Sequence, residues 1–163
     1  MEIVSGLVTG GPCSGKTQGF EFLKPKLKEL GITAVFAPEV ATPMILAGPH
    51  PQFMPEDEMV EWQNISLKIQ LAQERDHYRG IAEIAGRLNK TDRVLLLHDR
   101  GALDNGVYMP RPRFNEILKR NKLTWVTGRE GLYDFVIHLA TAAHGAEAHY
   151  NNNNAARTET PVE

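Results

Sequence analysis

Residues 10–17 read GGPCSGKT, which matches the phosphate-binding pattern G-x-x-x-x-G-K-[ST] at every specified position. An apolar run from Ile3 to Val8 precedes this stretch, and a helix-compatible run from Thr17 to Leu30 follows it. In this order of strand, glycine-rich loop and helix, backbone N–H groups and the positive end of the helix dipole surround phosphate groups. The sequence therefore predicts that the loop binds a nucleoside triphosphate.

Each position of this loop has an expected role. Lys16 is expected to bridge the terminal phosphates, and the hydroxyl of Thr17 is expected to hold Mg²⁺. Ser14 and Gly15 are expected to supply backbone donors, while Cys13 fits better as a small loop residue than as a nucleophile. The residues expected to surround the nucleotide are Gly11, Pro12, Cys13, Ser14, Gly15, Lys16 and Thr17.

Composition limits the size and the class of the protein. Its 163 residues, 42% hydrophobic and 23% charged, suffice for a single domain over residues 1–163. The formal net charge of −2 provides no general attraction to nucleic acid or to anionic membranes, so neither partner is expected. Without a bilayer-length apolar run or a signal segment, membrane insertion is not expected either. With one cysteine there is no intrachain disulfide, and the cytoplasm is the expected location.

Strand-like and helix-like segments alternate along the chain, which is typical of a parallel sheet with helices on both faces. We therefore predict an α/β fold, arranged as a three-layer α/β/α sandwich. Four strands are expected, at residues 3–8, 32–37, 94–98 and 133–139.

Other segments carry weaker predictions. Four prolines between residues 42 and 55 predict a loop. Residues 56–88 have a helical pattern with a possible break near Gly80. His98 and His138 lie in apolar strands and are expected in the core. The apolar residues at helical spacing that we expect to face the core, rather than a cofactor, are Met59, Trp62, Ile65, Ile69 and Ala72.

Two charged residues come directly after the third predicted strand. A carboxylate placed there, beside a phosphate-binding loop, can hold Mg²⁺ directly or through water, and this is the role expected of Asp99. Arg100 follows, and its planar guanidinium suits phosphate oxygens. An ordinary surface turn would explain Asp99 and Arg100 taken alone, but the presence of the phosphate-binding loop favours a functional site.

Glu39 follows the second predicted strand, at the sheet edge where ligands bind in open α/β folds. Its carboxylate could orient a hydroxyl group and accept its proton, as a kinase requires for its acceptor. An exposed loop glutamate is an equally good interpretation of this position taken alone.

Three further patterns have simpler explanations. Residues 89–92 spell N-K-x-D, a guanine-recognition sequence in many GTPases, but they precede the third strand, opposite the nucleotide, where a polar turn is expected. The basic residues between 111 and 129 could close over phosphates or form a solvated helix face. The six histidines lack zinc-type spacing, so a metal-binding protein is not expected.

Four motifs in addition to the loop carry a resemblance to a known family. They are PEVAT at residues 38–42, DRG at 99–101 with Asp104, YD at 133–134, and TAA at 141–143 continuing through Asn153 and Arg157. Together the five motifs resemble the small AAA-domain ATPase/kinase family, which is loosely tied to nicotinamide-riboside-type kinases and to the GTP-binding domain of the TRPL translocation defect protein.

The resemblance implies a nucleoside-kinase-like fold with strand order 2-3-1-4, and it strengthens Glu39, Asp99 and Arg100 as site residues. In related deoxynucleoside kinases, a glutamate after the second strand serves as base. Members of this family usually continue into another helix and a final strand, so we expect this chain to lack its last strand. Residues 140–163 are expected to form a polar, lid-like or flexible segment in which Arg157 contacts the nucleotide.

Taken together, these features predict Mg²⁺-dependent phosphoryl transfer from ATP or GTP to a small hydroxylated acceptor. Lys16 and Arg100 would stabilise charge, Thr17 and Asp99 would hold the metal, and Glu39 would orient the acceptor. The alternative is a nucleotide-binding switch that hydrolyses slowly and acts on a protein or lipid partner. The choice between ATP and GTP and the oligomeric state stay open at this point.

Overall fold

The computed structural model describes residues 1–48 and 50–142, and at its centre lies one parallel sheet. Its strands are β1 (Glu2–Gly10), β2 (Thr33–Ala37), β3 (Arg93–Asp99) and β4 (Phe135–Leu139). Their order is β2-β3-β1-β4 and every neighbouring pair is parallel, which confirms the predicted topology. Parallel pairing places the carboxyl ends of β1, β2 and β3 together at one edge of the sheet.

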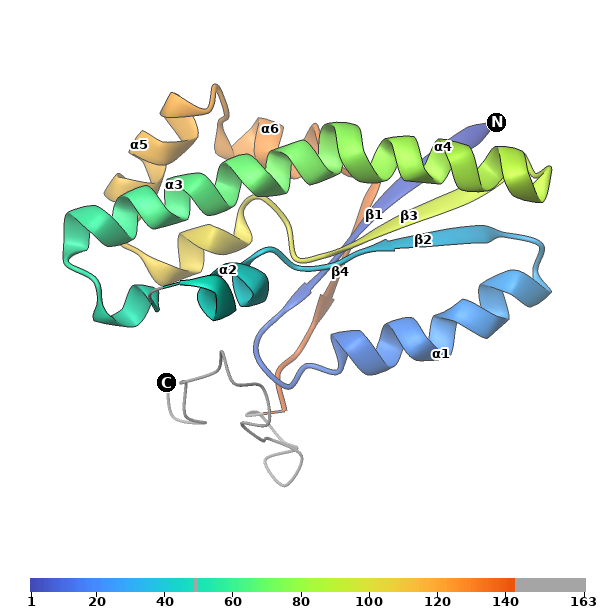
Figure 1. The fold of residues 1–163 in the computed structure, drawn as a ribbon, viewed down its shortest axis with the longest axis horizontal. Helices are drawn as coiled ribbons and strands as arrows, with labels where there is room; N and C mark the ends of the chain where they lie inside the picture. The colour runs from blue at the N-terminus through green and yellow to red at the C-terminus, as the bar shows by residue number, and fades with distance from the viewer. Residues whose placement is uncertain (49, 143–163) are drawn as a thin grey trace.

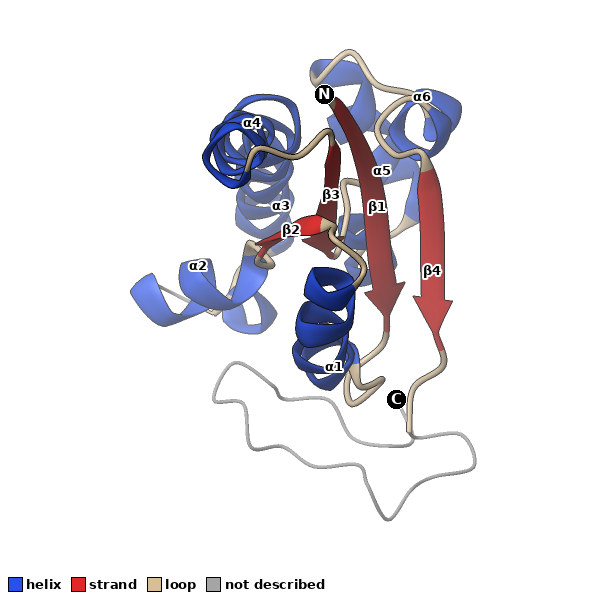
Figure 2. Cartoon of the chain, turned by 90° about the vertical axis from the view of Figure 1, so that its right-hand side faces the viewer, coloured by secondary structure: helices blue, strands red, loops and turns tan. Residues whose placement is uncertain are grey.

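Helices cover both faces of this sheet, as Figures 1 and 2 show. The described α-helices are α1 (Lys16–Glu29), α2 (Ala41–Ala47), α3 (Glu56–Ala72), α4 (Tyr78–Asn89), α5 (Arg111–Arg120) and α6 (Trp125–Glu130). Phe20 of α1 shares one core cluster with Leu97 of β3, whereas Ala82 of α4 shares another with Leu96. Because successive strand residues point to opposite faces, β3 supplies both cores, and the three-layer sandwich is confirmed.

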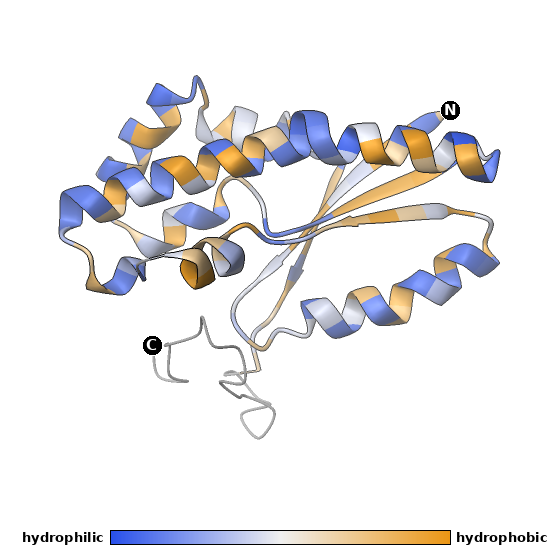
Figure 3. Ribbon diagram, viewed as in Figure 1, coloured by the Kyte–Doolittle hydropathy of each residue, from blue (hydrophilic) through white to orange (hydrophobic). Residues whose placement is uncertain are grey.

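The apolar residues of β2 and β3 lie between the helices in Figure 3, where they form these two cores. A third core lies between α3 and α5, where Leu67, Phe114 and Ile117 are fully buried. None of the helices in the described ranges combines the length and the apolar character needed to cross a membrane.

Two of the basic residues after position 110, both on α5, form ion pairs with α3. The Arg113 Nε lies 3.2 Å from an oxygen of Glu56, and an Arg120 nitrogen lies 3.2 Å from an oxygen of Glu61. Both acids belong to α3, so these cations link α5 to α3. Of the two interpretations left open by the sequence, these contacts favour the solvated helix face.

The expected loop at residues 42–55 is wrong in part, because α2 begins at Ala41 and a 3₁₀ turn, η1 (Pro51–Phe53), follows it. Pro43 is tolerated in the first turn of α2, where a backbone N–H has no partner within the helix. The expected break near Gly80 is also misplaced. A π-helical turn, η2 (Gln73–His77), joins α3 to α4, and Gly80 lies inside α4.

The expected core face of α3 is wrong in part. Met59 is partly buried and packs against the third core, as predicted, but Ile65 is 44% exposed and Ile69 is 38% exposed. Trp62 and Ala72 are only partly buried. The helix instead buries a face that mixes apolar and polar side chains: Val60, Gln63, Asn64, Ser66, Leu67, Gln70 and Leu71. Two of these polar residues make hydrogen bonds that offset their desolvation cost: Asn64 accepts from Asn121, and the Gln70 amide donates to Glu74.

The two strand histidines have different surroundings. His98 is buried as predicted, and its Nε2 lies 3.2 Å from the hydroxyl of Ser5. Burial lowers the pKa of His98 to about 4. His138, in contrast, is exposed, because it lies on β4, an edge strand among the described residues. The prediction of a core position for His138 is therefore wrong.

Candidate functional site

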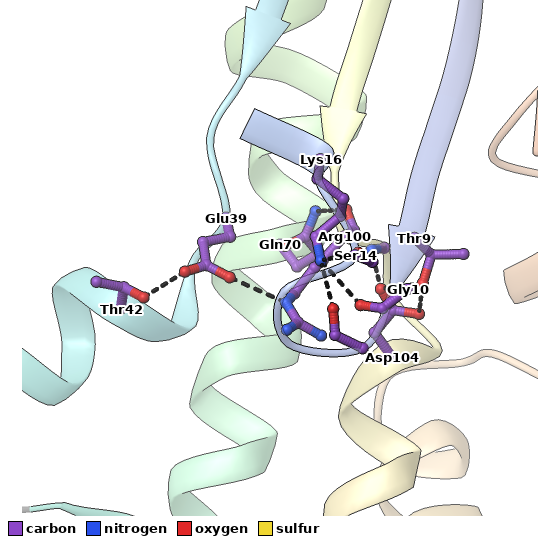
Figure 4. Close-up of polar contacts among 11 residues, drawn as sticks. Thr9, Gly10, Ser14, Lys16, Glu39, Thr42, Gln70, Arg100 and Asp104 are labelled. Carbon is purple, nitrogen blue, oxygen red and sulfur yellow. Dashed lines mark hydrogen bonds and ion pairs between the residues drawn. The ribbon is translucent and has the colours of Figure 1, made fainter. Parts of the chain in front are cut away.

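The glycine-rich loop connects the end of β1 to the start of α1. Gly10 has a φ of +148°, and a Cβ atom there would lie 2.3 Å from the carbonyl oxygen of Leu139, so only glycine fits. The Lys16 ammonium lies within the loop, where it donates to the carbonyl oxygens of Gly10 at 2.9 Å and Gly11 at 3.2 Å (Figure 4). It also lies 3.2 Å from the hydroxyl oxygen of Ser14.

The first turn of α1 carries no acidic residue, so the positive end of its dipole is free to attract an anion. Lys16 provides a full positive charge at the same place. Burial lowers the pKa of Lys16 and the nearby Arg100 lowers it further, while Asp99 and Glu39 act in the opposite direction. The loop thus combines a helix N-terminus with a lysine, an arrangement that phosphate groups fit.

The register of the sheet brings Asp99 to this loop. Val8 of β1 pairs with Asp99, the last residue of β3, so the carboxyl group stands two residues before the end of β1. Its Oδ1 atom is buried and has no hydrogen-bond partner among the described residues. Burial raises the pKa of Asp99 to about 6. A buried carboxylate oxygen without a donor fits a cation ligand.

The residues present therefore fit a magnesium ion. Thr17 is the second residue of α1 and its side chain is exposed at the loop. Mg²⁺ usually takes one or two protein ligands and completes its shell with phosphate oxygens and water. Asp99 and Thr17 are the protein ligands we expect.

Arg100 and Glu39 form an ion pair beside the loop, as Figure 4 shows. The Arg100 Nε donates to Glu39 Oε2 at 2.9 Å, and the Thr42 hydroxyl donates to the other carboxylate oxygen. The Arg100 side chain is 20% exposed and that of Glu39 is 25% exposed, so both remain accessible to a ligand. The fold thus brings the ends of β2 and β3 together in the way the sequence predicts.

Asp104 is a member of this cluster that the sequence analysis did not assign to the site. It lies in a 3₁₀ turn, η3 (Asp104–Tyr108), and both its oxygens lie 2.8 Å from the hydroxyl of Thr9. It also accepts from the backbone N–H of Gly101 at 3.1 Å. The D-R-G-x-x-D spacing could have indicated this position, because a turn of this length after Asp99 returns the chain to the same edge of the sheet.

Two further sequence predictions concern other places. Arg157 and nearly all of the expected lid-like segment lie outside the described residues. Residues 89–92 comprise the last residue of α4 and the turn that leads to β3, at the end of β3 opposite Asp99. The amide of Asn89 there lies 3.2 Å from the hydroxyl of Thr33, at the start of β2. This placement agrees with a polar turn rather than a guanine-reading segment.

The Asp99→Asn substitution should weaken Mg²⁺–nucleotide binding about tenfold or more, with little change when Mg²⁺ is removed by chelation. The amide keeps the shape of the side chain but lacks the negative charge that attracts the cation. Because burial disfavours the ionised carboxylate, the variant alone should also melt slightly higher at pH 7. Calorimetric titration with and without Mg²⁺ measures the effect, and equal losses under both conditions would remove Asp99 from the metal site.

A strand, a glycine-rich loop with its lysine, and an acid at the end of the neighbouring strand define a nucleotide-binding P-loop NTPase domain. A family model described as an AAA domain matches residues 6–163. The chain therefore belongs to this AAA domain family, as the resemblance of its motifs indicated. No match to the chain was found among curated proteins.

Proposed function

We propose that the protein transfers the terminal phosphoryl group of ATP or GTP to a small hydroxylated acceptor, such as a nucleoside, in a Mg²⁺-dependent reaction. The observation that supports this most is the position of Glu39. A carboxylate held beside the phosphate-binding loop by Arg100 and Thr42 is more than nucleotide binding requires. It suits a group that receives the proton of an acceptor hydroxyl.

The remaining residues have roles that follow from their charge and position. Lys16 and Arg100 would neutralise the charge that develops on the transferred phosphoryl group and on the leaving diphosphate. Asp99 and Thr17 would hold Mg²⁺, which supplies further charge neutralisation when bound. Backbone N–H groups of the loop would fix the phosphates in place.

In the proposed step, the acceptor oxygen forms a bond to the terminal phosphorus while the bond from that phosphorus to the bridging oxygen breaks. The electron pair of the broken bond stays on the diphosphate, and the acceptor proton moves to a Glu39 oxygen. Each Glu39 oxygen accepts one hydrogen bond in the structure, from Thr42 or from Arg100, and a carboxylate oxygen has a second lone pair with which it could accept from the acceptor hydroxyl. The other nitrogens of the Arg100 guanidinium would then contact the phosphates.

A transfer assay tests this proposal. The full chain is given terminally labelled ATP or, separately, labelled GTP, together with Mg²⁺ and a pool of nucleosides and small metabolites. We expect label to appear on one class of metabolite. Slow release of label as free phosphate alone would favour the nucleotide-binding switch, and no Mg²⁺–nucleotide binding would contradict both. The same proposal includes the expected partners, a nucleoside triphosphate and a small-molecule acceptor, and the expected cytoplasmic location.

A further inference from the structure

The turn that carries Arg100 is held from behind by a buried polar network of Gln70, Glu74 and Tyr133. The Tyr133 hydroxyl donates to Glu74 Oε1, and the Gln70 amide donates to the same oxygen at 2.9 Å. All three side chains are buried, with 4%, 7% and 9% of their surfaces exposed, respectively. They come from α3, from the π-helical turn η2 and from the segment before β4.

The network holds two backbone groups of the turn after β3. The Gln70 amide donates to the carbonyl oxygen of Arg100 at 3.2 Å, and the N–H of Ala102 donates to the Tyr133 hydroxyl oxygen at 3.1 Å. Glu74 is the acceptor that orients both Gln70 and Tyr133. Its other oxygen is buried without a hydrogen-bond partner among the described residues.

The shape of the turn depends on this support. Arg100 has a φ of +68°, which is unfavourable for a residue with a side chain and needs the surrounding structure to maintain it. A Cβ atom on Gly101 would lie 2.5 Å from the Tyr133 hydroxyl oxygen, so the ring fills the space directly behind the turn. Asp104 accepts a hydrogen bond from the N–H of Gly101. The turn is therefore constrained at three consecutive residues.

We infer that Gln70, Glu74 and Tyr133 are positioning residues that hold the Arg100 backbone so that its guanidinium reaches the terminal phosphate. None of the three lies in the glycine-rich loop, so their effect on nucleotide binding passes through Arg100. This inference rests on the proposed function, which assigns Arg100 to the phosphates. A wholly structural role would instead lower stability without a selective effect on the terminal phosphate.

The test compares the affinity of the full chain for Mg²⁺–ATP and Mg²⁺–ADP by calorimetric titration, or for the guanine nucleotides if these bind more tightly. Arg100→Ala should reduce the preference for the triphosphate about tenfold, because a charge-assisted contact to the terminal phosphate is lost. Tyr133→Phe should reduce it about fivefold. Introduced into the Arg100→Ala background, Tyr133→Phe should change the preference less than about twofold.

Gln70→Met provides a second variant, because it removes only the amide that joins Glu74 to the Arg100 carbonyl, and it should give the same pattern if Tyr133→Phe fails to fold. Tyr78→Phe is the matched control, since Tyr78 packs against the core of α4 and β3, and it should bind as the wild type does. Equal effects of the network variants with and without Arg100, or no effect in either background, would overturn the inference while leaving the proposed function intact. Failure of the wild type to bind either nucleotide would overturn both.

Discussion

Replacing Lys16 with alanine should abolish the thermal protection that Mg²⁺–nucleotide gives to the protein. At a nucleotide concentration about 100 times the dissociation constant, the wild type should melt about 5–10 °C higher than without ligand. The variant should show no shift, because Lys16 is the cation inside the loop and contacts the backbone that surrounds the phosphates. Differential scanning fluorimetry with ATP and with GTP measures the effect.

The loss should be confined to ligand binding. The Lys16 ammonium is partly desolvated in the loop, which lowers its pKa, so its removal is not expected to unfold the protein. Lys28→Ala is the matched control, because Lys28 lies on the same helix with an exposed side chain. Unchanged protection in the Lys16 variant would refute the assignment of the nucleotide site to residues 10–17.

Glu39→Gln should reduce phosphoryl transfer at least about a hundredfold while leaving Mg²⁺–nucleotide affinity within about threefold of the wild type. Glutamine preserves the shape of the side chain and can still accept from Arg100, but it cannot take up the acceptor proton. The labelled-nucleotide assay measures transfer, and calorimetry measures affinity on the same preparations. Glu29→Gln, at the exposed end of α1, is the control.

The two readouts separate the possible roles of Glu39. Transfer at the wild-type rate would exclude it as the base. Loss of nucleotide affinity together with transfer would indicate that Glu39 acts by holding Arg100, with which it forms an ion pair at 2.9 Å, rather than by contacting the acceptor. Selective loss of transfer is the result that the proposed mechanism requires.

Part of the site could be predicted because it depends on contiguous residues and on one rule of sheet geometry. The loop at residues 10–17 is a local motif. Asp99 and Glu39 were predictable because each follows an apolar strand, and parallel strands bring their carboxyl ends to one edge. Because Glu39 follows β2 and Arg100 follows the neighbouring strand β3, their proximity could be expected, but the geometry of their ion pair could not.

The helical spacing of apolar residues predicted burial poorly in α3, where polar side chains with hydrogen-bond partners are buried instead. The isoleucines of α3 follow a helical spacing, yet Ile65 and Ile69 are exposed and Gln70 is buried. Gln70 is stable inside because Glu74 and the Arg100 carbonyl accept its amide hydrogens, and sequence spacing contains no information on such partners. Similarly, the apolar pattern of β4 could not show that His138 would be exposed, on a strand at the edge of the sheet that the described residues form.

Adjacent residues were enough to predict the glycine-rich loop, the parallel α/β class and the acids at the strand ends, because these features depend on local patterns and on the geometry of parallel strands. The buried face of α3, the π-helical turn between α3 and α4 and the contact of Tyr133 with Glu74 became evident only in the folded structure. Those two residues are 59 positions apart, and their pairing results from the packing of whole elements. Side chains so distant in sequence find each other only after the sheet and its helices have brought them within hydrogen-bond range.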